Sequence, residues 1–118
     1  MIQSRLSCRG CRPRSAGLDG IFDVIISSDE VGRGKPARDV FLETARRLGV
    51  APGACAVVED SGYGVTAAQR AGMRCIAIPY RVGLPMDEAI SGAELLLQDG
   101  MASVDGAGVF EWIRATRA

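Results

Sequence analysis

The sequence predicts an α/β fold in which a parallel sheet is flanked by helices. From residue 17 onward, short apolar and β-branched segments alternate with amphipathic helical segments. Strands that are joined through helices pair in parallel, with right-handed crossovers. The expected strands are 22–26, 54–59, 75–78 and 94–97, and the expected helices are 37–48, 62–71, 108–116 and a short one at 87–91.

The apolar patterns define the first strand and helix. Residues 22–26 (FDVII) form a short apolar run typical of a strand buried on both faces. The helix over 37–48 carries apolar side chains on one face and charged ones on the other. Its apolar face consists of Val40, Phe41, Ala45 and Leu48. Gly49 is suited to end this helix.

The second helix, over 62–71, has suitable residues at both ends. Ser61 or Asp60 can supply the N-cap oxygen that accepts from the first turn. Gly72 can close the last turn, with Met73 folding back on the helix. The two loops at the ends of strands 22–26 and 54–59 then meet at the carboxyl edge of the sheet, where function collects in such folds.

Composition limits the classes of protein that this chain can belong to. With 118 residues, 47% hydrophobic and 24% charged, it matches a small soluble domain. Fourteen basic and fourteen acidic residues leave no basic footprint for a nucleic acid. No apolar run approaches the roughly 20 residues of a membrane helix. The first ten residues lack the apolar stretch of a secretory signal, so a cytoplasmic protein is expected.

The start of the chain differs from the rest. Residues 1–16 are rich in arginine and show no periodicity, so we expect an irregular segment before a domain over 17–118. Cys8 and Cys11 form a C-x-x-C, which is compatible with half a zinc site or a redox pair. A structural zinc needs two further ligands, and the chain has no histidine. We therefore interpret Cys8 and Cys11 as free thiols, and Cys55 and Cys75 as buried ones.

Two adjacent carboxylates, Glu59 and Asp60, end the expected strand 54–59. Like charges side by side repel, and burial penalises each further. A Mg²⁺ ion relieves both penalties, because it is commonly held by one or two carboxylates together with a substrate phosphate. In the alternative interpretation, Asp60 only caps the helix and Glu59 faces solvent.

Lys35 lies in a glycine-rich loop at the same edge of the sheet, directly before Pro36. A lysine there can place a compact positive charge against a phosphate or a carboxylate. It is not the lysine of a P-loop, which is followed by Ser or Thr. A solvated loop lysine is the plain alternative.

A glycine pattern competes with this interpretation. Gly62, Gly64 and Ala67 fit the G-x-G-x-x-A of dinucleotide-binding folds. That motif also requires an acidic residue about 20 positions on, at the end of the next strand. Tyr80 and Arg81 stand there instead, so the dinucleotide signal is weak.

Together these motifs resemble a known family. The stretch from FDVIISSDEVGRGKPARD to VVEDSGYGVTAAQRAGMRCIAIP resembles the C-terminal half of the core of haloacid dehalogenase-like (HAD) hydrolases. The resemblance covers roughly residues 17–80 and is strongest to the branch of phosphoglycolate phosphatases and β-phosphoglucomutases. It implies a Rossmann-like three-layer fold. It also implies that Lys35 of G-K-P neutralises a nucleophilic aspartate and the transferring phosphoryl group.

The resemblance implies further roles at the end of the strand over 54–59. Asp60 is expected to bind Mg²⁺ directly, and Glu59 directly or through water. Ser61 and Gly64 are expected to shape the loop that follows. Among relatives a proline usually stands where this chain has Arg38.

The other half of the family's site is not found in the chain. Family members begin with D-x-D-x-[TV], whose first aspartate is the nucleophile, and no such motif occurs here. The serine or threonine motif would fall near Ser4 or Ser7, and the cap domain would lie between these two elements. Without the nucleophile strand and its neighbour, the sheet is expected to be incomplete, with open edges that favour self-association.

We therefore expect the C-terminal half of a Mg²⁺-dependent HAD-like hydrolase. The complete enzyme would hydrolyse a small phosphorylated metabolite through an aspartyl-phosphate, whereas this chain alone would be inactive. The alternative is a non-catalytic α/β module whose sheet edges are covered by a partner or a second copy.

Overall fold

A parallel sheet in the order β1-β2-β3-β4 forms the centre of the fold. The structure, a computed structural model, describes residues 2–3, 24, 26–80 and 87–115. The strands are β1 (Ile2–Gln3), β2 (Ala56–Glu59), β3 (Arg74–Ala77) and β4 (Leu95–Leu96). Residues 56–59 of β2 pair with residues 74–77 of β3 along the whole length of both strands.

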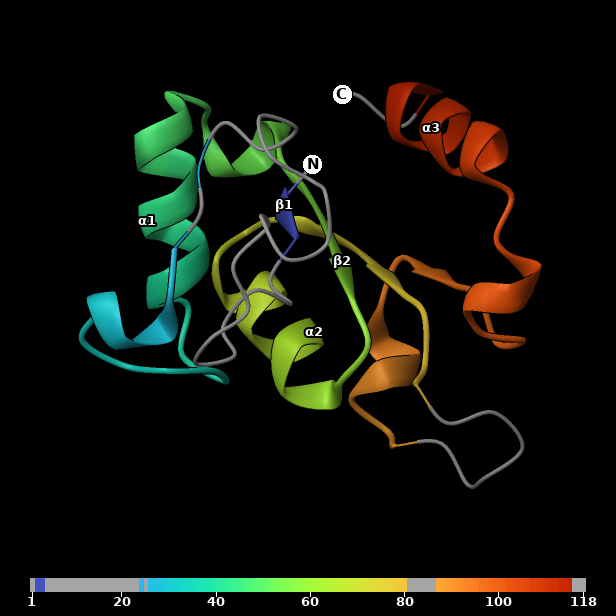
Figure 1. The fold of residues 1–118 in the computed structure, drawn as a ribbon, viewed down its shortest axis with the longest axis horizontal. Helices are drawn as coiled ribbons and strands as arrows, with labels where there is room; N and C mark the ends of the chain where they lie inside the picture. Colours follow the sequence, from blue (N-terminus) through green and yellow to red (C-terminus); the bar gives the residue numbers. More distant parts are fainter. Residues whose placement is uncertain (1, 4–23, 25, 81–86, 116–118) are drawn as a thin grey trace, which may run out of the picture.

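Helices flank this sheet, as predicted (Figure 1). The α-helices are α1 (Asp39–Leu48), α2 (Gly62–Arg70) and α3 (Gly106–Ala115). Single-turn 3₁₀ helices are η2 (Ser28–Glu30), η3 (Pro52–Ala54), η4 (Ile90–Gly92) and η5 (Met101–Ser103). Helix α2 contacts β2, β3 and α1, whereas α3 lies on the far side of the molecule from α1 (Figure 1). Within the described residues, no helix is long and apolar enough to cross a membrane.

The ends of the helices confirm the predicted turn chemistry. Ser61 caps α2, because its side chain accepts a hydrogen bond from the amide of Gly64 at 3.2 Å. Gly72 follows α2 with a φ of 73°, and the amide of Met73 donates back to the carbonyl of Ala68 at 3.0 Å. Gly49 ends α1 in the same left-handed conformation, with a φ of 70°.

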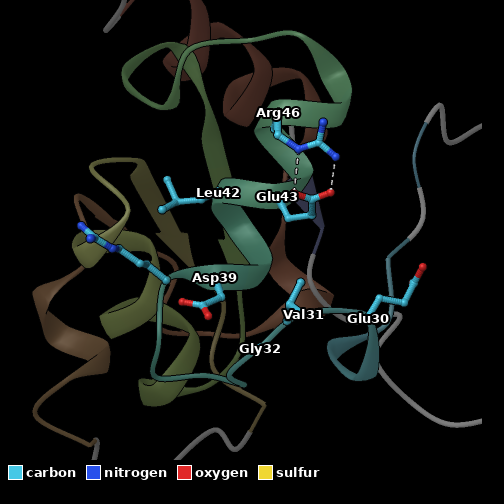
Figure 2. A pocket seen from close by; sticks show the side chains of 8 residues that line it. Glu30, Val31, Gly32, Asp39, Leu42, Glu43 and Arg46 are labelled. Carbon is cyan, nitrogen blue, oxygen red and sulfur yellow. Dashed lines mark hydrogen bonds and ion pairs between the residues drawn. The ribbon is translucent and has the colours of Figure 1, made fainter.

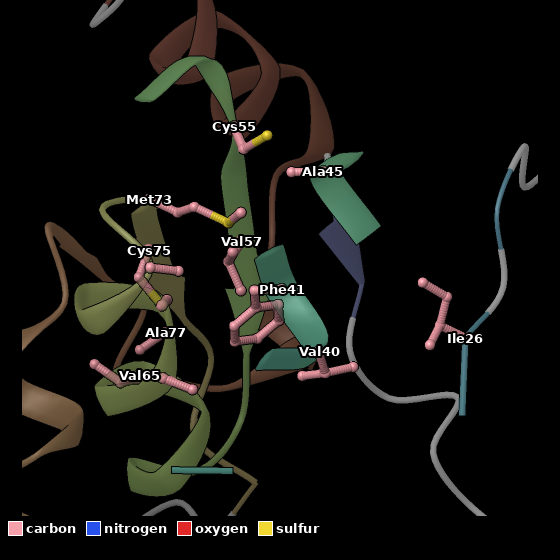
Figure 3. Close-up of a cluster of buried hydrophobic side chains, with 13 residues drawn as sticks. Ile26, Val40, Phe41, Ala45, Cys55, Val57, Val65, Met73, Cys75 and Ala77 are labelled. Atoms are coloured by element: carbon pink, nitrogen blue, oxygen red, sulfur yellow. The ribbon is translucent and has the colours of Figure 1, made fainter. Parts of the chain in front are cut away.

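The hydrophobic core lies between the sheet and the first two helices. Figure 3 shows Phe41 of α1, Val57 of β2 and Val65 of α2 directed into one cluster with Cys75 of β3. The side chain of Phe41 is fully buried. This packing confirms the apolar face predicted for α1, on which Val40, Phe41 and Ala45 are all buried.

Two predictions about the start of the domain were wrong. Val24 and Ile26, the described residues of the expected strand 22–26, are not in a strand; the other three lie outside the described residues. Instead Ile2–Gln3, inside the segment expected to be irregular, pairs with Val57 and Val58 as β1. A strand exists only where a neighbour completes its hydrogen bonds. The place beside β2 is occupied by β1, and Val24 and Ile26 form no part of the described sheet.

The remaining elements match the expected ones with shifted boundaries. Helix α1 begins at Asp39 rather than residue 37, since Pro36 and Ala37 belong to a turn in which the amide of Ala37 donates to the carbonyl of Gly34. The short helix expected at 87–91 is a 3₁₀ turn over Ile90–Gly92. Cys8 and Cys11 lie outside the described residues.

The two buried thiols provide a test of the core. The pKa of Cys75 is raised from 9.0 to about 12, mainly by burial and to a smaller extent by the nearby carboxylates of Glu59 and Glu94. Because the folded-state pKa is the higher one, the contribution of this thiol to stability is complete below pH 9 and is lost as the pH rises toward about 12. Burial also raises the pKa of Cys55.

We therefore expect Cys75 to react with iodoacetamide at pH 8 at least about a hundredfold more slowly in the folded chain than in urea. Peptide mass spectrometry measures the alkylation rate of Cys55 and of Cys75, each in the folded chain and in urea. Equal rates with and without urea would show that β3 is not packed as described.

Candidate active site

A buried ion pair between Lys35 and Glu59 is the centre of the candidate site. The ammonium Nζ of Lys35 donates to Oε1 of Glu59 at 2.7 Å. The side chain of Glu59 is 1% exposed and that of Lys35 is 19% exposed. The ammonium also lies 5.3 Å from the centroid of the Phe41 ring, within cation–π range. The charge of Lys35 is thus held between a carboxylate and an aromatic face, with a small part of the side chain exposed.

The second oxygen of Glu59 is also engaged. Oε2 accepts from the amide of Asp60 at 3.2 Å and from the hydroxyl of Ser61 at 3.5 Å. Ser61 in turn accepts from the amide of Gly64. A Cβ at Gly64 would overlap the carboxylate of Glu59, so a glycine is required where α2 passes this side chain. The loop after β2 therefore fixes the orientation of Glu59 from several sides.

The loop over residues 27–36, called the Lys35 loop below, reaches Glu59 although no strand lies directly before it in the described residues. The Lys35–Pro36 peptide bond is cis. At the front of this loop, Glu30 accepts from the amide of Ser27 at 2.6 Å and pairs with Arg47 at 3.6 Å. Lys35 and Glu59, which lie 24 positions apart in sequence, thus meet at one edge of the sheet, as predicted for the two loops.

Asp60 follows Glu59 at the end of β2 and is half-buried. In the described part of the chain, no three His, Cys, Asp or Glu side chains come together as they would around a metal ion. One half-buried carboxylate at the carboxyl edge still fits Mg²⁺, which often takes one or two protein carboxylates and fills its other positions with water and phosphate. Glu59 fits less well, because the oxygens of its carboxylate accept from Lys35, Asp60 and Ser61.

An open pocket of about 600 Å³ lies next to the Lys35 loop and α1 (Figure 2). It is lined by Glu30, Val31, Gly32, Arg38, Asp39, Leu42, Glu43 and Arg46. Figure 2 shows Glu43 and Arg46 joined by two hydrogen bonds, at 2.6 and 2.8 Å. Lys35 and Glu59 do not line this pocket, so it is separate from the ion pair.

Two contributors to the site were not predicted from the sequence. Phe41 was assigned to the core only, and Arg70 was given no role. The guanidinium of Arg70 donates to the carbonyl of Pro36 at 3.1 Å. Lys35 is also the single lysine of the sequence, in which all other basic residues are arginines. This feature of the composition could have indicated from the sequence that Lys35 has a specific role in the site.

The fold and the site together define a parallel α/β domain that presents a lysine and two carboxylates at one sheet edge. The family described as haloacid dehalogenase-like hydrolase matches residues 4–72. The chain belongs to this family, in the branch that contains phosphatases and β-phosphoglucomutases.

The similar proteins are longer than this chain. The bifunctional riboflavin kinase/FMN phosphatase of Arabidopsis thaliana is 53% identical over 63 residues, which cover 53% of this chain and 17% of that protein. Fructose-1-phosphate phosphatase YqaB of Escherichia coli (strain K12) is 44% identical over 62 residues, which cover 52% of this chain and 33% of that protein. The chain thus spans a third or less of either relative.

A solved structure shares the fold. The β-phosphoglucomutase from Clostridium difficile superposes with a TM-score of 0.71 at 23% identity, over 87% of this chain and 43% of that one. This likeness confirms the predicted Rossmann-like α/β class for a partial domain.

Proposed function

We propose that this chain provides the lysine- and metal-bearing half of the active site of a Mg²⁺-dependent phosphomonoester hydrolase. The substrate would be a small phosphorylated metabolite, in keeping with the FMN and fructose-1-phosphate phosphatases among its relatives. The main support is the Lys35–Glu59 pair, a buried and oriented positive charge at the edge of the sheet. The balanced charge of the chain favours a small-molecule partner over nucleic acid, and a cytoplasmic setting remains our expectation.

Each residue of the site has a proposed task. Lys35 keeps N–H donors beyond the one given to Glu59, and these can bind a phosphate oxygen and neutralise its charge. Glu59 positions that ammonium. Asp60 would hold Mg²⁺, with Glu59 contributing at most through water. When bound, the ion would supply further neutralisation of phosphate charge.

Ser61, Gly64 and Pro36 hold this arrangement in shape. Ser61 caps α2 and donates to Glu59, and Gly64 leaves room for the Glu59 carboxylate. In the complete enzyme, the first aspartate of a D-x-D-x-[TV] motif would attack phosphorus, and this motif does not occur in the sequence of this chain. The chain alone is therefore expected to turn over a generic phosphomonoester negligibly.

Binding of inorganic phosphate tests the proposal without requiring turnover. In a calorimetric titration with Mg²⁺ present, Lys35→Met should weaken phosphate binding by roughly tenfold or more, because a charge-assisted hydrogen bond is lost. Asp60→Asn should remove the dependence of binding on Mg²⁺, and Arg114→Gln, at an exposed residue of α3, should change nothing.

Equal phosphate affinity in the wild type and Lys35→Met would refute the proposal. Mg²⁺-dependent turnover by the chain, abolished in Asp60→Asn, would instead reveal a nucleophile outside the D-x-D-x-[TV] pattern.

A second candidate function is a non-catalytic module that associates through its sheet. The observation that favours it is the shortness of β1 and β4, since β1 pairs with only Val57 and Val58 of β2. In the described part of the chain, β1 covers only two of the four residues of β2, which leaves room beside β2 for a partner strand or a second copy. Size-exclusion chromatography with hydrogen exchange separates the two candidates: a dimer with protected β2 amides favours the module, and an exchange-labile monomer favours the half-site.

A further inference from the structure

We infer that Arg70, the last residue of α2, is a positioning residue for Lys35. Any effect of Arg70 on phosphate binding rests on the function proposed above, whereas its hydrogen bond to the Lys35 loop does not depend on that function. The Nη1 of Arg70 donates to the carbonyl of Pro36 at 3.1 Å, across 34 positions of sequence. This carbonyl belongs to the residue directly after Lys35. The bond therefore acts on the backbone that carries the ammonium group.

The Lys35 loop needs such an external tether. Gly32 and Gly34 give its backbone wide conformational freedom. The start of α1 does not hold it, because Arg38 at the N-cap makes no side-chain hydrogen bond to the first turn. The local turn, from the amide of Ala37 to the carbonyl of Gly34, lies within the loop itself. The contact of Arg70 instead connects the loop to a helix that packs on the sheet.

Helix α2 thereby acts on both partners of the ion pair. At its N-terminus, Ser61 and Gly64 define where the carboxylate of Glu59 lies. At its C-terminus, Arg70 holds the backbone from which Lys35 reaches that carboxylate. One rigid element therefore sets the separation of the two charges. Arginine suits this task, since its guanidinium is always charged and offers several donors on a long side chain.

Acylation of Lys35 measures this positioning directly. Lys35 is the single lysine, so N-hydroxysuccinimidyl acetate can modify one side-chain amine in the chain. In the wild type, the Glu59 pair and burial should protect it. Arg70→Gln should raise the acylation rate roughly two- to fivefold, as expected when one exposed hydrogen bond to a charged donor is lost and the loop opens more often.

Gln69→Ala is the matched control. The side chain of Gln69 also leaves the last turn of α2 and donates to a distant carbonyl, that of Gly92, at 2.8 Å. Its hydrogen bond goes to η4 and not to the Lys35 loop, so its removal should leave Lys35 acylation unchanged. Alkylation of the buried Cys75, followed in the same samples, reports opening of the whole core.

The possible outcomes are distinct. A rise in Lys35 acylation without a rise in Cys75 alkylation supports the inference. This holds even if the chain binds no phosphate and the proposed function is thereby refuted. An unchanged Lys35 rate in Arg70→Gln overturns the inference, and so does an equal rise at Lys35 and Cys75, which would indicate general destabilisation. If Arg70→Gln also weakens phosphate binding, by less than Lys35→Met does, positioning of Lys35 is linked to its proposed role.

Discussion

Replacing Glu59 with glutamine is expected to destabilise the fold by about 2–4 kcal/mol. The substitution leaves the Lys35 ammonium, 19% exposed, without its counter-charge. Removing one partner of a buried pair costs more than the pair contributes, because the remaining charge stays desolvated. The partial exposure of Lys35 places the expected loss toward the lower end of that range. Urea denaturation of both proteins measures the difference.

A double-mutant cycle separates the pair from other effects of the substitution. Lys35→Met alone leaves the Glu59 carboxylate, 1% exposed, without its cation. The double variant removes both charges, so its loss should be smaller than the sum of the single losses by about 1–3 kcal/mol. Additive losses would contradict the pairing of Lys35 and Glu59.

The exposed pair of Glu111 and Arg114 provides the matched control for the glutamine substitution. Their atoms are 3.6 Å apart and their side chains are 71% and 66% exposed. Glu111→Gln should therefore change the free energy of unfolding by less than about 0.5 kcal/mol, as is usual for surface pairs. A comparable loss at Glu59 and Glu111 would mean that burial does not govern the result.

Gly64→Ala should also destabilise the fold, by about 1–3 kcal/mol. Within a helix, alanine is normally favoured over glycine by roughly 0.5–1 kcal/mol. Here the new Cβ would overlap the carboxylate of Glu59, so either that side chain or the first turn of α2 must move. Either movement disturbs the bond to Lys35, and acylation of Lys35 should increase together with the loss of stability.

Gly106→Ala is the matched control for Gly64→Ala. Gly106 begins α3, and a Cβ there would meet nothing within 4 Å. This substitution should leave stability unchanged or raise it slightly. The opposite signs expected for the two glycines test whether the Glu59 carboxylate lies against α2. A stable Gly64→Ala variant with protected Lys35 would show that it does not.

Much of the fold could be predicted because it depends on local patterns. The apolar face of α1, the Ser61 cap and the left-handed Gly49 and Gly72 all follow from residue type and spacing. Val24 and Ile26, the described residues of the strand expected over 22–26, are not in a strand. Strand formation depends on which segments lie side by side and not on local pattern alone. Ile2–Gln3 pairs with β2, and no periodicity in two residues could have revealed it.

The sequence by itself determined the family, the parallel α/β class and the two loops that carry Lys35, Glu59 and Asp60. These features depend on motif wording and on alternation along the chain. Only the tertiary structure showed that Lys35 is paired with Glu59, that Gly64 makes room for this carboxylate and that Arg70 holds the lysine loop. Each of these contacts brings together residues from separate loops and helix ends, so its geometry depends on how α2 packs on the sheet and not on local spacing.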